Sequence, residues 1–187
     1  MHPLISGRWS ARGYDDAAAI DDEDLTTILE AGRWAPTWGR IQPVRFVVGR
    51  RGDATFAALT DSLNKGNATW APASAAFVLV CTTDEPDDPD KHAYGAVDAG
   101  LALGQMILQA QALGFNGHPM AGFSKATARE VFAIPDDIRP LAILAIGRLA
   151  DDPTTLSQEI RERDAWPRER LPLDRIAFAG RWGEPFA

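Results

Sequence analysis

The longest stretch without a charged side chain, residues 99–124, restricts the possible folds of this chain more than any other feature. It is long enough to cross a lipid bilayer. However, it contains Gln105, Gln109, Gln111, Asn116 and His118 together with several glycines. This polarity is too high for a hydrocarbon environment. The sequence therefore predicts a soluble chain, with a helix over residues 98–113 that is buried on most of its circumference and a loop after it.

Two glycines, Gly100 and Gly104, lie inside this predicted helix. Each costs a helix roughly 1 kcal/mol relative to alanine. A helix usually retains such residues where another segment packs very close to it. We therefore expect a close neighbour on that face, for which a second subunit is one candidate.

The rest of the chain alternates between helix and strand patterns. Leu25, Ile28 and Leu29 have helical spacing after acidic N-cap candidates, and Pro36 ends that helix. A short helix is expected around residues 56–63, and another from Ser124 to about Phe132. Strands are expected at residues 43–49, 75–82 and 140–147, and a charged loop at 84–92. The alternation leaves the α/β and α+β classes open.

Composition limits the class of protein. The chain has 187 residues, which predicts a single domain, and residues 151–187 resemble a charged, proline-rich arm rather than a second core. The formal net charge of −7 makes nucleic acid an unexpected partner. One cysteine, Cys81, allows no internal disulfide, and the N-terminus lacks a signal-peptide pattern. We therefore expect a cytoplasmic protein.

Several common catalytic and binding motifs are missing from the sequence. It contains no glycine-rich dinucleotide fingerprint after a strand, no P-loop and no nucleophile elbow. His2, His92 and His118 are scattered, and the acidic residues of the 84–92 loop lack metal-ligand spacing. The sequence therefore predicts neither a metal site nor a serine-hydrolase triad.

Four segments carry residues that could bind a ligand. Arg8, Ser10 and Arg12 alternate near the N-terminus, and Arg168 and Arg170 stand between two prolines. Guanidinium groups offer paired donors that match phosphate oxygens, although isolated surface arginines more often form ion pairs. The other two segments are turns, APTWGRIQP at 35–43 and GFNGHPMAGF at 114–123, whose glycines let backbone N–H groups approach a flat ligand. Ordinary turn chemistry is the alternative for both turns.

Five motifs in one order resemble the FMN-dependent nitroreductase family. They are RWSAR at 8–12, APTWGRIQPVRF at 35–46, the glycine-bearing helix leading into PMAGF at 119–123, AILAIG at 142–147 and RERLP at 168–172. The resemblance extends from Arg8 to about Asp174. It implies an α+β fold, a three-layer α/β/α sandwich with a mixed, mostly antiparallel sheet and the long helix at a homodimer interface. It also implies that the arm extends over the partner subunit.

The resemblance assigns FMN-binding roles to particular residues. Arg8, Ser10, Arg12, Arg168 and Arg170 would hold the phosphate and ribityl end, with Trp9 as part of that segment. Pro36, Thr37 and Trp38 would reach the flavin of the other subunit, while Pro119, Met120, Ala121 and Gly122 would line the isoalloxazine ring. Trp38 and Met120 would also shape the acceptor pocket. Asn67 is a candidate for the pyrimidine edge of the ring, and Arg40 stands where many members have asparagine, either adding positive charge near the flavin or pointing to solvent.

The implied activity is an NAD(P)H oxidoreductase. NADPH or NADH would deliver a hydride to N5 of FMN, and a nitroaromatic, a quinone or a related small electrophile would then be reduced in a ping-pong cycle. The cofactor supplies this chemistry, so no catalytic side chain is expected. Two alternatives remain open: specialised flavin chemistry such as dehalogenation, ene reduction or flavin breakdown, and a protein that stores FMN without accepting hydride.

Overall fold

The computed structural model describes residues 1–186 and contains a four-stranded sheet in the order β1-β2-β4-β3. The strands are β1 (Val44–Arg50), β2 (Ala76–Thr83), β3 (Asn116–Met120) and β4 (Ile138–Gly147). Every neighbouring pair is antiparallel. The predicted α+β class is thus confirmed, but the described residues contain no parallel strand pair, so within this chain the sheet is antiparallel rather than mixed.

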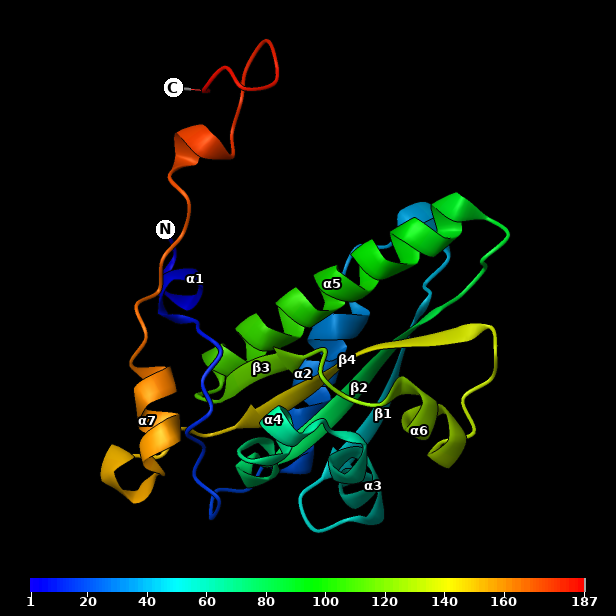
Figure 1. The fold of residues 1–187 in the computed structure, drawn as a ribbon. Helices are drawn as coiled ribbons and strands as arrows, with labels where there is room; N and C mark the ends of the chain where they lie inside the picture. The colour runs from blue at the N-terminus through cyan, green and yellow to red at the C-terminus, as the bar shows by residue number, and fades with distance from the viewer. Residues whose placement is uncertain (187) are drawn as a thin grey trace.

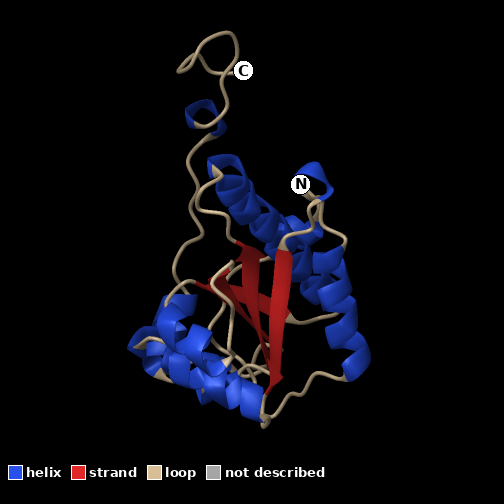
Figure 2. Cartoon of the chain, turned by 90° about the vertical axis from the view of Figure 1, so that its right-hand side faces the viewer, coloured by secondary structure: helices blue, strands red, loops and turns tan. Residues whose placement is uncertain are grey.

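Helices cover both faces of the sheet (Figures 1 and 2). The longer helices are α2 (Asp22–Arg33), α3 (Ala54–Ser62) and α5 (Pro89–Ala112). The shorter ones are α1 (Pro3–Gly7), α4 (Lys65–Ala68), α6 (Lys125–Val131) and α7 (Gln158–Asp164), with 3-10 turns at Trp38–Arg40, Ala71–Ala73, Pro153–Thr155 and Leu173–Arg175. Helices α2 and α5 lie on one face, and α3 and α6 lie on the other, which gives the predicted three layers.

The period of two along the central strands explains these layers. On β2, Phe77 and Leu79 pack against the α3 and α6 side, whereas Val78 and Val80 pack against α2 and α5. All four side chains are fully buried. A strand whose side chains are apolar on both faces must be buried by other elements on both faces. The apolar residues at 75–82 therefore indicate a strand in the middle layer of a sandwich.

The helices begin at the residues that their sequences indicate. Asp21 caps α2, Asp53 caps α3 and Ser124 caps α6, each accepting a hydrogen bond from a backbone N–H two or three residues into the helix. Helix α5, in contrast, begins at Pro89 rather than near Asp98, with Asp88 as its N-cap. The proline and acidic residues of the predicted loop instead form a helix start, where proline is well tolerated.

Residues 116–120, expected to belong to a turn, form the edge strand β3. Their glycine and proline obscured the strand pattern in the sequence. Pro119 is compatible with this place because an edge strand need not donate every backbone N–H to a neighbour.

The C-terminal segment leaves the body of the molecule after α7 (Figure 1). Its large apolar side chains are exposed, among them Trp166, Leu171, Ile176 and Trp182. Trp182 is 92% exposed. These side chains pack into no core within the described part of the chain, and the prediction that this segment extends over a partner subunit stays a prediction.

Candidate functional site

The N-terminal segment of the candidate site lies alongside β3. The Asn116 side chain donates from Nδ2 to the Trp9 carbonyl at 3.0 Å, and Nδ1 of His118 is 2.7 Å from the Ala11 carbonyl. Asn116 and His118 are alternate residues of the strand, so both side chains point to the same face. Because a carbonyl only accepts hydrogen bonds, Nδ1 of His118 carries a hydrogen. Two buried polar side chains thus fix the backbone of residues 9–11.

An aromatic stack supports these two polar side chains. The His118 ring lies on the Trp70 ring with centroids 4.4 Å apart, and Tyr14 stacks on Trp70 as well. The Tyr14 hydroxyl also donates to Oδ1 of Asn116 at 3.2 Å. Burial lowers the pKa of His118, and the nearby positive charge of Arg12 acts in the same direction. Burial therefore favours the neutral form of the imidazole over the charged form.

Arginines from both ends of the chain come together at this segment. Arg168 donates from Nη1 to the Ser6 carbonyl at 2.8 Å. Burial lowers the pKa of Arg8, and the positive charges of Arg168 and Arg170 lower it further. None of the three has a carboxylate partner within 4.0 Å in the described residues. The structure thus brings together three guanidinium groups whose charges are not balanced.

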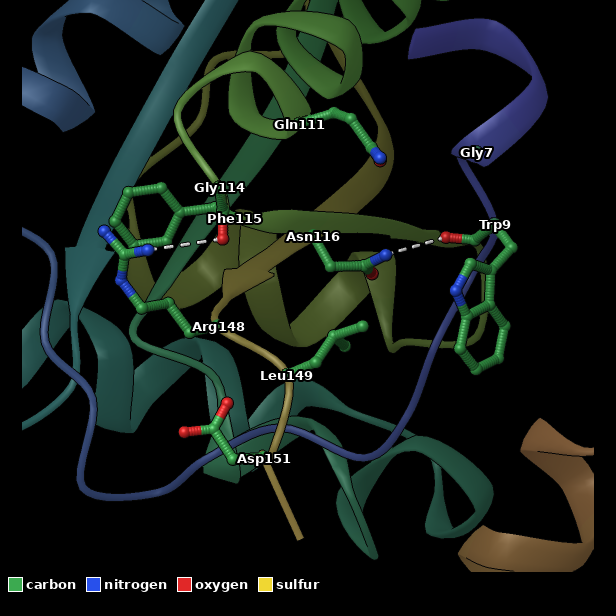
Figure 3. A pocket seen from close by; sticks show the side chains of 9 residues that line it. All are labelled: Gly7, Trp9, Gln111, Gly114, Phe115, Asn116, Arg148, Leu149 and Asp151. Carbon is green, nitrogen blue, oxygen red and sulfur yellow. Dashed lines mark hydrogen bonds between the residues drawn. The ribbon is translucent and has the colours of Figure 1, made fainter. Parts of the chain in front are cut away.

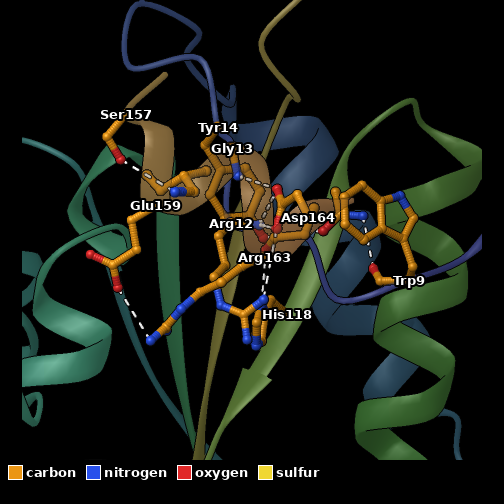
Figure 4. A network of polar contacts seen from close by, with 12 residues as sticks. Trp9, Arg12, Gly13, Tyr14, His118, Ser157, Glu159, Arg163 and Asp164 are labelled. Atoms are coloured by element: carbon orange, nitrogen blue, oxygen red, sulfur yellow. Dashed lines mark hydrogen bonds and ion pairs between the residues drawn. The ribbon is translucent and has the colours of Figure 1, made fainter. Parts of the chain in front are cut away.

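Arg12 differs from these three arginines. Its Nη1 lies 3.7 Å from Oδ1 of Asp164, so its charge is partly neutralised (Figure 4). Ser10 lies between Arg8 and Arg12, is partly exposed, and its hydroxyl makes no hydrogen bond within residues 1–186. The segment therefore presents one free cation, one free hydroxyl and one paired cation.

The segment that follows the C-terminal end of β3 contacts Asn67, the residue predicted for the pyrimidine edge of the ring. Asn67 donates from Nδ2 to the Gly122 carbonyl at 2.9 Å, and the Asn64 backbone N–H donates to the same oxygen at 3.0 Å. A Cβ on Gly122 would lie 2.9 Å from Nδ2 of Asn67, so only glycine fits without displacing it. Ala121 is exposed and Pro119 is partly exposed, in the segment that Asn67 of helix α4 contacts through Gly122.

Met120 does not have the place expected for its side chain. It is 3% exposed and belongs to the core between the sheet and α3. Its position on β3 explains this, since residue 120 points to the same face as His118. Met120 can therefore offer only its backbone to a ligand on the open side, whereas the sequence led us to expect its side chain to shape an acceptor pocket.

The predicted residues at 36–40 lie apart from the others. The Trp38 N–H donates to both carboxylate oxygens of Asp98 at 3.1 Å, and the Trp38 ring stacks on Tyr94. Asp98 is in the middle of α5, whereas Gly7 lies beside Gln111 near the C-terminal end of the helix. The 13 residues from 98 to 111 correspond to about 20 Å along the helix axis. Pro36, Thr37, Trp38 and Arg40 therefore lie far from the arginine cluster of the same chain.

Arg40 has an exposed side chain and a left-handed backbone with φ of 67°. Within the described residues its guanidinium group makes no ion pair and donates no hydrogen bond to another residue. In the single chain its side chain is exposed to solvent, and the expectation that it adds positive charge near the flavin stays a prediction.

A cavity of about 350 Å³ adjoins the N-terminal segment (Figure 3). Trp9 is the one predicted residue among those that line it. The Arg148 guanidinium lies over the Phe115 ring at 4.3 Å on one side of the cavity, and the Gln111 side chain lies toward Gly7 on another. The cavity separates the end of α5 from the segment that carries the arginines.

Sequence reasoning missed Asn116, His118, Asp98 and Asp164. Asn116 and His118 lie in the segment GFNGHPMAGF at 114–123. Their spacing of two residues was the available indication that both side chains point to the same face of a strand. Asp98 and Asp164 act on backbone groups that are 60 and 152 residues away. No local pattern reveals such contacts. The described residues contain no cluster of three metal-ligating side chains, and none of their helices is both long and apolar enough to cross a membrane.

Comparisons with known proteins show similarity over most of the chain. The sequence model of the Nitroreductase family matches residues 5–148. An uncharacterised 15.4 kDa protein of Mycolicibacterium smegmatis is 45% identical over 150 residues, which cover 76% of this chain and 99% of that protein. YdgI of Bacillus subtilis (strain 168), provisionally named an NAD(P)H nitroreductase, is 28% identical over 93% of this chain and 94% of its own length.

A crystal structure described as an oxidoreductase containing FMN superimposes with a TM-score of 0.88. It is 33% identical in sequence, and the match covers 97% of this chain and 92% of that one. By its sequence and its fold alike, the chain belongs to the nitroreductase family.

Proposed function

We propose that this protein is an FMN-dependent NAD(P)H oxidoreductase that reduces nitroaromatics, quinones or related small electrophiles. The observation that carries the proposal is the unbalanced cluster of Arg8, Arg168 and Arg170. Like charges repel, so a folded chain gains nothing by bringing three together unless an anion balances them. A phosphate monoester matches both the charge and the donor geometry of guanidinium groups. The FMN-containing relative supports the choice of ligand.

The residues around the cluster fit the remainder of a flavin nucleotide. Ser10 offers a free hydroxyl next to Arg8, and Arg12, already paired with Asp164, would face the ribityl part. The turn after β3 would lie against the ring, with Pro119, Ala121 and Gly122 and the Met120 backbone on one side. Asn67 has its Nδ2 committed to the Gly122 carbonyl, which fixes the amide and leaves Oδ1 to accept from the pyrimidine edge.

Bound FMN would supply the redox chemistry, taking a hydride from NAD(P)H and passing it to the acceptor in alternate half-reactions. The contributions of the chain are then binding and orientation. The arginines hold the phosphate, Asn67 orients the ring edge, and the exposed Ala121 leaves that face of the turn open to a second molecule.

The proposed active form is a homodimer. On α5, Val97 and Leu101 are exposed, and a Cβ on Gly100 or Gly104 would meet no atom within 4 Å. This apolar face with open space above its glycines is suited to the close approach of a second copy. In such a dimer the turn at Pro36–Arg40, which contacts Asp98 about 20 Å along α5 from Gln111, would contribute to the site of the partner.

The C-terminal arm is proposed to bind the partner subunit. A groove of about 790 Å³ runs between α2 and the edge strand β1, lined by apolar residues such as Leu29, Phe46 and Val48. The arm carries exposed apolar side chains of matching character, including Leu171 and Ile176. Burying them in the groove of a second copy would cover both surfaces and also fix Arg168 and Arg170 beside Arg8.

An absorption spectrum of the purified protein tests the function. We expect a flavin spectrum, or its recovery on adding FMN, and bleaching on anaerobic addition of NADPH or NADH. Colour should return when a nitroaromatic or a quinone is added. Binding without bleaching by either donor would support an FMN storage protein instead. Bleaching without reoxidation by these acceptors would support a different flavin reaction. A protein that does not bind FMN would refute the proposal.

A further inference from the structure

The end of helix α7 is attached to the N-terminal segment through one carboxylate. Asp164 accepts hydrogen bonds from the Arg12 backbone N–H, at 3.1 Å to Oδ1 and 3.0 Å to Oδ2, and from the Gly13 N–H at 2.9 Å to Oδ2 (Figure 4). Its Oδ1 also lies 3.7 Å from Nη1 of Arg12. The Asp164 side chain is 14% exposed, so this contact is shielded from solvent.

A second contact from the same part of the arm holds the other end of the segment. Arg168, four residues after Asp164, donates to the Ser6 carbonyl at 2.8 Å. Residues 164–168 therefore hold residues 6–13 at both ends, while Asn116 and His118 hold the middle from the side of β3. All of these bonds go to backbone groups. The side chains of Arg8 and Ser10 remain free to bind a ligand.

The charge of Asp164 makes its position informative. A carboxylate beside an anion site opposes binding through the Coulomb interaction. The same carboxylate favours binding if it holds the backbone in the conformation that directs Arg8 and Ser10 to the ligand, because less ordering is then needed when the ligand arrives. The two effects have opposite signs, so removing the carboxylate shows which is larger.

We propose that Asp164 is a positioning residue for the phosphate site, acting on the bend at Arg12–Gly13 and not by contact with the ligand. The inference rests on the proposed function, since it takes FMN as the ligand. It also makes flavin affinity depend on the docking of α7 against the N-terminal segment. Helix α7 lies outside residues 5–148, the part of the chain that the family model matches.

The test compares Asp164→Ala and Asp164→Asn with the wild-type protein, using the dissociation constants of FMN and riboflavin. Asp164→Ala removes every acceptor and should raise the Kd of FMN roughly tenfold or more. Asp164→Asn retains one acceptor oxygen and should raise it less. The ratio of FMN to riboflavin affinity should fall, because riboflavin lacks the phosphate. A general loss of structure would lower both affinities together and leave this ratio unchanged.

Glu159→Gln is the matched control. It removes the same charge from the same helix, but Glu159 pairs with Arg163, whereas the side-chain hydrogen bonds and the ion pair that residues 12 and 13 make in the described chain go to Asp164. It should leave the affinity for FMN unchanged. If Asp164→Ala does not fold, as judged by far-ultraviolet circular dichroism, Asp164→Asn carries the test alone.

The outcomes separate this inference from the proposed function. If the wild-type protein binds FMN and both Asp164 variants bind it equally well or more tightly, Asp164 is not a positioning residue and the proposed function stands. If the wild-type protein binds neither FMN nor riboflavin, both proposals fail.

Discussion

Replacing Arg8 tests the arginine cluster most directly, because the expected effects on binding and on stability differ. Arg8→Ala removes one of three clustered guanidinium groups. A hydrogen bond to a charged group contributes about 1.5–3 kcal/mol, and because Arg8 is partly exposed the lower part of this range applies. A loss of about 1.5–2 kcal/mol corresponds to a Kd for FMN about 12- to 30-fold higher. Quenching of flavin fluorescence on titration measures it.

In Arg8→Ala, the free energy of unfolding should not fall together with the affinity for FMN. In the protein without flavin, Arg8 is repelled by Arg168 and Arg170, and this repulsion helps to lower its pKa. Removing it relieves that repulsion, so the free energy of unfolding of the flavin-free protein should stay the same or rise slightly. A urea titration measures this quantity.

Two comparisons complete the experiment. Riboflavin affinity should change less than about threefold in Arg8→Ala, because the missing phosphate removes the partner of the guanidinium group. Arg163→Ala is the matched charge control, since Arg163 pairs with Glu159 on its own helix. Equal losses for FMN and riboflavin, or a loss of FMN affinity as large in Arg163→Ala, would refute the reasoning.

Three further predictions concern other parts of the molecule. Burial lowers the pKa of His118 from its ordinary value of 6.5, so the unfolded chain binds a proton more readily than the folded one. The free energy of unfolding should therefore fall as the pH falls through about 6.5. His118→Gln should flatten this pH dependence, as measured by urea titrations between about pH 8 and 5. Asp98→Ala should lower the free energy of unfolding by about 1.5–3 kcal/mol by freeing the Trp38 N–H, with a smaller loss in Asp98→Asn; identical losses would contradict a role as hydrogen-bond acceptor. Leu101→Lys should yield a 20.3 kDa monomer in sedimentation velocity, whereas Val131→Lys on α6 should stay dimeric; a dimeric Leu101→Lys would place the interface elsewhere.

The fold was largely predictable because its determinants are local. The strands at 44–50, 76–83 and 138–147 are apolar and β-branched, and the caps Asp21 and Ser124 lie where the sequence places them. Strand β3 was not predictable in the same way. Its five residues include glycine and proline, and it is a strand because it pairs with β4, a neighbour distant in the sequence.

Only the residues proposed to face the ligand could be predicted for the candidate site. Arg8 and Ser10 stand in a motif whose place in the order is informative, whereas Asn67 was a separate candidate outside the five motifs; the structure places Asn67 beside Gly122, another predicted residue. The residues that hold them, such as Asp164 and Asn116, act through backbone atoms more than 100 positions away. A hydrogen bond from a side chain to a distant backbone group can be made by several residue types, so it produces no recognisable motif in a single sequence. Met120 differs from these residues. It stands in one of the five motifs, but its position on β3 directs its side chain into the core, which the motif did not indicate.

The joining of residues 6–13 to residues 164–168 has a consequence for synthesis on the ribosome. Asp164 is translated 152 residues after Arg12, and until it emerges the bend at Arg12–Gly13 has no acceptor for its backbone N–H groups. The sheet and its helices, residues 22–147, can assemble before that point. The arginine cluster cannot, because Arg168 and Arg170 come later still. A nascent chain can therefore form its layered core before its arginine cluster, and if that cluster binds the phosphate as proposed, FMN would bind only after the arm has been translated.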